Sequence, residues 1–137
     1  MKPEEITLVK NAIHRPEEPR HFMRIKVLER EVTAAYDNKI LIRSGNALKI
    51  QEAGMDLYDP VYYFPKEAFP EHVLEATDKS SHCPLKGDTT YYHMNLENEQ
   101  LKNIAWEYTK PFDRSSKLKG YVALDASLFQ IVEHINS

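Results

Sequence analysis

The residues best suited to chemistry gather in one stretch, residues 81–92, which reads Ser-His-Cys-Pro-Leu-Lys-Gly-Asp-Thr-Thr-Tyr-Tyr. It holds the only cysteine of the chain, Cys83, together with His82 and Lys86. A cation near a thiol favours the thiolate, which is the form of cysteine that acts as a nucleophile or as a soft ligand. We therefore predict a site in which Cys83 is a nucleophile or redox thiol, Lys86 binds an anion, and Lys86 or His82 supplies the activating charge.

Two residues of this stretch restrict its backbone. Pro84 fixes its own φ and lacks an N–H donor, whereas Gly87 tolerates positive φ. The chain between them is therefore predicted to make a tight turn, from which Cys83, Lys86 and the ring of His82 can reach one small pocket.

The same residue types also have a purely structural interpretation. A lone cysteine commonly packs as a small buried hydrophobe, and a lysine is commonly a solvated surface cation. Tryptophan and tyrosine side chains that alternate along a strand commonly belong to the core. A reductase-like reaction would also need an external thiol, because the chain has no second cysteine to resolve an oxidised Cys83.

The composition is that of an ordinary soluble globular domain. Of the 137 residues, 42% are hydrophobic and 28% are charged, and the net charge is −3. This balance gives no basic field, so we do not expect general binding to nucleic acid or to anionic membranes. No apolar run approaches the roughly 18 residues of a spanning helix, and the N-terminus does not resemble a signal peptide. We therefore expect a cytoplasmic protein.

The supply of metal ligands is small. One cysteine excludes an intramolecular disulfide and the zinc sites that need two to four thiolates, although a site of histidines and carboxylates stays possible. The six histidines do not cluster at ligand spacing. We therefore predict no metal site and no cofactor.

The pattern of elements predicts a mainly β fold after a short N-terminal helix. Residues 1–15 show apolar side chains at helical spacing, with acidic residues near the start. Asp37 and Asn38 separate two strand-like runs and suit a two-residue hairpin turn. A helical turn or two is expected within residues 66–76. One more helical turn is expected at residues 113–116, with Asp113 as its N-cap.

A second hairpin is expected from residues 89–96 and 101–109, with Ile104, Trp106 and Tyr108 on one face. Seven or eight short antiparallel strands favour a sandwich, an open barrel or two packed sheets over a parallel nucleotide-binding sheet. We divide the chain into an N-terminal helical or extended segment, residues 1–30, and a β-rich domain, residues 31–137.

Four groups of short motifs follow one another along the chain. They are Tyr63-Phe64-Pro65, then Cys83-Pro84-Leu85-Lys86-Gly87 with Tyr91-Tyr92, then Ala105-Trp106-Glu107-Tyr108 with Pro111, and finally Lys119-Gly120-Tyr121-Val122-Ala123. Their order and spacing resemble the bacterial domain-of-unknown-function family numbered 427. The resemblance covers about residues 31–133 and includes Arg43-Ser44 and Glu52-Ala53-Gly54.

The resemblance implies a β-tent fold, as in methionine sulfoxide reductase B, Yippee-like proteins and the translationally controlled tumour protein. Several of those proteins hold zinc through paired Cys-x-x-Cys motifs, which a chain with one cysteine cannot do. The family has been labelled a nucleotidyltransferase, but the chain shows no set of two or three carboxylates arranged to hold magnesium.

The family's signature residues carry over at Tyr63, Pro65, Cys83, Lys86, Gly87, Tyr91, Trp106 and Tyr108. The chain departs from the pattern at Leu85, Leu124 and Ala68. At position 68 the family often has an acidic residue, and its loss weakens any mechanism that needs an acid beside Lys86.

Two functions follow from these patterns. The first is a pocket for an unknown small molecule around Cys83 and Lys86, with an aromatic wall of Tyr63, Tyr91, Trp106 and Tyr108; whether it catalyses a reaction stays open. The alternative is a non-catalytic module that recognises a protein or peptide through the sheet or its edge, with Cys83 packed in the core. A reactive thiol favours the first function, and an unreactive thiol in a filled interior favours the second.

Overall fold

The computed structural model describes residues 11–135, which form a mainly β single domain with two short 3-10 helices. A large sheet has the strand order β1-β2-β5-β6-β11-β10-β9-β7, with β8 also paired to β9, and a small sheet has the order β12-β3-β4. Every strand pair in both sheets is antiparallel. The expectation of short antiparallel strands is therefore confirmed.

The large sheet comprises β1 (Ile13–Arg15), β2 (Glu18–Val27), β5 (Leu48–Ala53), β6 (Val61–Pro65), β7 (Leu74–Ala76), β8 (His82–Cys83), β9 (Gly87–Asn95), β10 (Gln100–Pro111) and β11 (Tyr121–Leu124). The small sheet comprises β3 (Val32–Tyr36), β4 (Lys39–Ser44) and β12 (Gln130–Glu133). The two 3-10 helices are η2 (Lys66–Ala68) and η3 (Asp113–Leu118).

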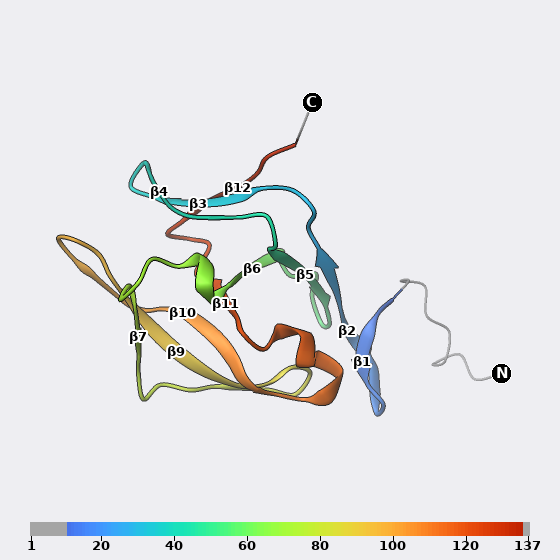
Figure 1. Cartoon of the computed structure of the whole chain (residues 1–137). Helices are drawn as coiled ribbons and strands as arrows, with labels where there is room; N and C mark the ends of the chain where they lie inside the picture. Colours follow the sequence, from blue (N-terminus) through green and yellow to red (C-terminus); the bar gives the residue numbers. More distant parts are fainter. Residues whose placement is uncertain (1–10, 136–137) are drawn as a thin grey trace.

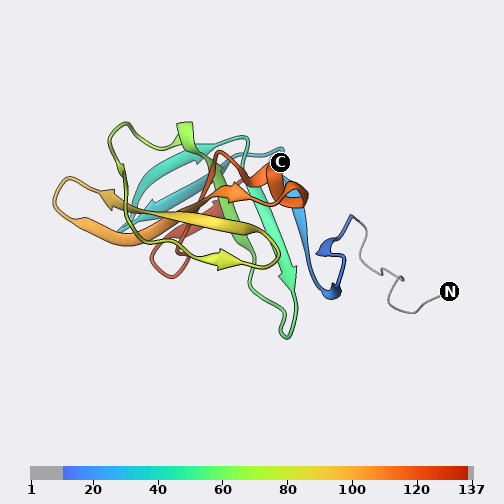
Figure 2. The same ribbon diagram turned by 90° about the horizontal axis from the view of Figure 1, so that it is seen from below.

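The large sheet curls into a half barrel, and the small sheet lies across one of its faces (Figure 1). In the turned view, the direction of β2 and β5 makes a steep angle with that of the β9–β10 hairpin, as expected of a strongly curled sheet (Figure 2). Both faces of the sheet are covered, because Tyr63 and Phe64, which are neighbours on β6, belong to two different buried clusters.

The first buried cluster lies between the two sheets and includes Val32, Ile42, Phe64, Met94, Val122 and Phe129. The second cluster lies on the other, concave face, which we call the concave cluster, and includes Met23, Leu48, Ile50, Tyr63, Leu85, Tyr108, Leu118 and Ala123. Since Leu118 belongs to η3, this helix packs inside the curl of the large sheet.

The first predicted hairpin is confirmed. β3 pairs with β4 across Asp37 and Asn38, whose φ angles are 50° and 64°. Two successive positive φ angles are what a type I′ turn requires, and Asp and Asn tolerate them better than most residues.

The short helix expected over residues 1–15 is not seen. Residues 1–10 lie outside the described part of the chain, and Ile13–Arg15 form strand β1 instead. The apolar spacing around Ile13 indicated a helix, but Ile13 lies in a strand, where it is paired with Met23 of β2 and packs on the concave cluster. Tertiary pairing therefore decides the conformation of this short segment.

The two further helical turns that were expected are present, but they differ from the expectation in detail. Residues 66–76 contain one 3-10 turn, η2, after which Leu74–Ala76 form strand β7 on β9. The turn after β10 is present as η3, but its N-cap is Phe112 and no side chain caps it, so Asp113 is not the N-cap.

The side chains expected to share one face of β10 are only partly correct. Trp106 and Tyr108 contact the concave cluster, whereas Ile104 belongs to the cluster between the sheets. The register of β9 and β10 shifts between Leu101 and Ala105, and Asn103 in that bulge has a φ of 53°. A bulge adds residues to one strand and therefore changes which side chains share a face.

Candidate functional site

The predicted tight turn joins β8 to β9, with Cys83 paired to Gly87. Gly87 has a φ of 122°, and a Cβ added there would lie 2.4 Å from the carbonyl oxygen of Lys110. The turn therefore packs directly on the backbone of β10, which only glycine allows. This close approach directs Leu85, which is fully buried, and Lys86 towards the concave face.

Lys86 is a buried cation. Its residue is only 9% exposed, and its Nζ lies 2.6 Å from Oε1 of Glu52 on β5. The other carboxylate oxygen of Glu52 accepts a hydrogen bond from Nε2 of His21 on β2, at 2.7 Å. The Lys86 Nζ also lies 5.6 Å from the ring centroid of Tyr108, where a cation is attracted to the aromatic face.

The charged forms of Lys86 and Glu52 stabilise each other. Burial alone would raise the pKa of Glu52, but the Lys86 charge and the hydrogen bonds from His21 and Lys86 hold it below its ordinary value of 4.5. Burial alone would lower the pKa of Lys86, but the charge of Glu52 and the hydrogen bond to it hold this pKa above 10.5. At neutral pH, therefore, Glu52 is a carboxylate and Lys86 is an ammonium ion.

The predicted aromatic residues lie around the same turn. The ring centroids of Tyr63 and Tyr108 are 6.5 Å apart, and those of Tyr91 and Trp106 are 6.1 Å apart. Burial raises the pKa of both Tyr63 and Tyr108, so both phenols are neutral. Cys83 is half-buried and packs on the concave cluster, as do Tyr63, Tyr108 and Trp106.

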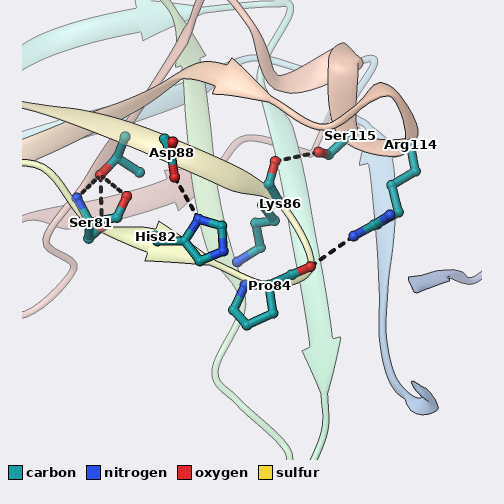
Figure 3. Close-up of polar contacts among 8 residues, drawn as sticks. Ser81, His82, Pro84, Lys86, Asp88, Arg114 and Ser115 are labelled. Atoms are coloured by element: carbon teal, nitrogen blue, oxygen red, sulfur yellow. Dashed lines mark hydrogen bonds and ion pairs between the residues drawn. The ribbon is translucent and has the colours of Figure 1, made fainter. Parts of the chain in front are cut away.

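His82 is not part of this group. It precedes Cys83 on β8, and successive side chains of a strand point to opposite faces. Its Nδ1 hydrogen bonds to Asp88 at 2.6 Å (Figure 3). Its ring meets the ring of Phe112 edge-on, and it borders a separate polar cleft with Ser81. Within the described residues, no hydrogen bond or ion pair joins His82 to Lys86. The catalytic role expected for His82 therefore stays a prediction.

The comparison with protein families identifies the family of the chain. The family model described as "Domain of unknown function (DUF427)" matches residues 24–134. The chain belongs to the DUF427 family. The expected resemblance is thus confirmed, and the match begins within β2, earlier than the expected residue 31. A search of the curated proteins found no match.

Sequence reasoning about this DUF427 chain missed Glu52 and His21 as site residues. They are 31 positions apart and meet only because β2 pairs with β5, with Met23 opposite Glu52. The one signal was the Glu52-Ala53-Gly54 motif, which carries part of the family resemblance. Glu52 supplies an acid beside Lys86, whereas Ala68 packs on the cluster between the two sheets.

A cleft reaches this group from the His21 side. It has a volume of about 590 Å³ and is lined by Glu18, Arg20, His21, Gly54, Met55 and Tyr58. Since neither Cys83 nor Lys86 lines it, the pocket expected around these two residues stays a prediction. Within residues 11–135, no three His, Cys, Asp or Glu side chains are grouped to hold a metal ion, and no helix is long and apolar enough to cross a membrane.

Proposed function

We propose that this DUF427 chain binds a small anionic molecule on the concave face of the large sheet, with Lys86 as its charge partner and Cys83 beside it. The observation that supports this most is the buried pair of Lys86 and Glu52. A buried ion pair is weak as a stabilising device, because apolar residues of similar size usually serve as well. A charged lysine inside an aromatic cluster is therefore a candidate functional group.

Lys86 is suited to act as a charge rather than as a nucleophile. Its raised pKa keeps the amine protonated, and a protonated amine has no lone pair for attack. An ammonium group carries three N–H donors, and Glu52 occupies one of them. An incoming anion can therefore bind Lys86 while Glu52 keeps its hydrogen bond from His21.

Cys83 gives the proposed site a reactive group. It is half-buried, and as a thiolate its charge would act on Lys86 and Tyr108. A bound molecule with an electrophilic atom would meet this thiol, so catalysis is compatible with the site and is left open. The β-tent assignment implied by the resemblance is part of the same proposal.

The alternative, a protein or peptide interaction module, is favoured by one feature away from the turn. The loop between β5 and β6 carries Met55 and Leu57, which are 104% and 81% exposed. Large apolar side chains exposed together on one loop are typical of a surface that contacts a partner.

Two alkylating reagents of equal size distinguish these functions. Iodoacetate is anionic and iodoacetamide is neutral, and a free thiolate repels the anionic one. If Lys86 attracts anions beside Cys83, the iodoacetate-to-iodoacetamide rate ratio at Cys83 should exceed that of N-acetylcysteine amide, a free thiol without a carboxylate, by about tenfold, which corresponds to about 1.4 kcal/mol.

Lys86→Met should abolish this excess. Lys49→Met is the matched control, because Lys49 also pairs with a glutamate, Glu133, and lies 5.5 Å from a tyrosine ring. It stands between Leu48 and Ile50 of the concave cluster on β5, so its side chain lies on the other face of the strand. A wild-type ratio equal to that of the free thiol contradicts the proposed site. A thiol that reacts only after unfolding favours the interaction module.

A further inference from the structure

The turn that carries Lys86 is held by side chains of η3. Arg114 donates from Nη2 to the carbonyl of Pro84 at 2.8 Å and from Nε to the carbonyl of Leu85 at 3.1 Å. Ser115 donates from its hydroxyl to the carbonyl of Lys86 at 2.6 Å. Figure 3 shows both side chains reaching the turn from η3. Three successive carbonyls of the turn are thus bound by two neighbouring residues.

The bonds of Arg114 differ from those of other arginines in the described chain. Other arginines of the described chain, Arg20 and Arg43 among them, pair with carboxylates, as guanidinium groups commonly do. Arg114 instead directs two N–H groups to neutral carbonyls. Ser115 has no exposed surface, so its hydroxyl is committed to the backbone groups around it.

The bonds fix the orientation of the turn relative to the concave face. The carbonyls of Leu85 and Lys86 belong to the two planar peptide units on either side of the Lys86 Cα, so holding both carbonyls fixes the direction of the Lys86 Cα–Cβ bond. The backbone N–H of Phe112 also donates to the carbonyl of Lys86, at 2.9 Å. On the inner side, Leu85 and Leu118 are both fully buried in the concave cluster. The turn is therefore held from both sides.

We propose that Arg114 and Ser115 are positioning residues, which hold the turn so that the Lys86 ammonium meets Glu52 and stays beside Cys83. This inference rests on the function proposed above for the same site. Lysine has a long, flexible side chain, and a displacement of its Cα is enough to lengthen the 2.6 Å contact with Glu52. Arg114 and Ser115 act on the site only through this backbone.

The pKa of Glu52 reports on the position of the Lys86 ammonium beside it. The Glu52 side-chain carboxyl is titrated by ¹³C NMR in the wild type and in the variants Arg114→Gln, Ser115→Ala and Lys86→Met. In the wild type the pKa of Glu52 lies below its ordinary value, because Lys86 stabilises the carboxylate. Lys86→Met should raise the pKa of Glu52. Arg114→Gln and Ser115→Ala should each raise this pKa by part of the change that Lys86→Met produces.

Arg43→Gln is the control, because it removes an arginine from an exposed pair with Glu31 on the small sheet and should leave Glu52 unchanged. Arg114 is only half-buried, so Arg114→Gln should fold. The proposal is overturned if Arg114→Gln and Ser115→Ala lower the Tm but leave the titration of Glu52 as in the wild type. A purely structural role gives that result.

The two proposals fail separately. The Glu52 titration needs neither a ligand nor the Cys83 thiol, so it decides the positioning role even if the proposed anion site is wrong. A wild-type protein with no preference for iodoacetate contradicts the anion site alone. If both proposals hold, Arg114→Gln and Ser115→Ala should also reduce the iodoacetate-to-iodoacetamide rate ratio at Cys83, whereas Arg43→Gln should not.

Discussion

Replacing Lys86 by Met and Glu52 by Gln, singly and together, measures how strongly these two side chains stabilise each other. Two unit charges 2.6 Å apart attract by roughly 6 kcal/mol at an effective dielectric constant of about 20. Removing both ions from water costs several kcal/mol each, so little of this attraction remains as net stability. The coupling within the folded protein, by contrast, should be large.

Each single variant leaves one buried charge without its partner. Complete isolation of such a charge costs about 3–5 kcal/mol. Here Glu52 keeps its bond from His21, and Lys86 keeps the Tyr108 ring, so we expect about 2 kcal/mol for each single variant. The double variant removes both charges and should cost about 1 kcal/mol, which gives a coupling energy of about 3 kcal/mol.

Urea unfolding at neutral pH measures all four proteins, since the free energy of unfolding falls linearly with denaturant. The Lys49 and Glu133 pair is the control: the Lys49 side chain is 23% exposed, against 11% for Lys86, so the cycle Lys49→Met and Glu133→Gln should give about 1 kcal/mol. If the costs of Lys86→Met and Glu52→Gln simply add in the double variant, the two side chains do not interact, and the site does not depend on their ion pair.

Three further outcomes are expected. The Lys86–Glu52 contribution should be complete between the ordinary pKa values of 4.5 and 10.5, and be lost as pH falls through the lowered pKa of Glu52 or rises through the raised pKa of Lys86. Urea unfolding of the wild type and the double variant at about pH 3 and pH 7 checks the acid side, where equal stability differences would contradict it. Gly87→Ala should cost about 3 kcal/mol or more, because its Cβ would meet the Lys110 carbonyl at 2.4 Å, and a loss below about 1 kcal/mol in urea would contradict that contact. Asn38→Gly should stabilise the protein by about 0.5 kcal/mol, because φ there is 64°, and a destabilised variant would contradict the assigned turn.

Local sequence signals were sufficient where a feature depends on a few adjacent residues. Asp37 and Asn38 marked a hairpin because both tolerate positive φ. Pro84 and Gly87 marked the tight turn, because proline restricts its own φ and glycine allows positive φ. The motifs around Cys83, Tyr63 and Trp106 also led to side chains that pack on one cluster.

Features that depend on pairing between distant segments could not be read in the same way. Glu52 and His21 meet through the register of β2 and β5, which no local pattern specifies. The bulge at Asn103 moved Ile104 to the other face of β10, although its spacing from Trp106 suggested a shared face. The apolar spacing near Ile13 served a strand rather than a helix, because β2 offered a partner.

The strands within residues 11–135 do not close the half barrel, and an open sheet exposes backbone groups that can recruit other chains and start aggregation. Both ends of the large sheet are short, since β1 and β7 have three residues each. Among the described strands, β1 covers β2 only as far as Met23, and the strand that continues beyond it carries Arg24 and Lys26. Short edge strands and edge cations are two of the means by which β proteins stay monomeric at high concentration, so Lys26→Val should make this protein more prone to form fibrils.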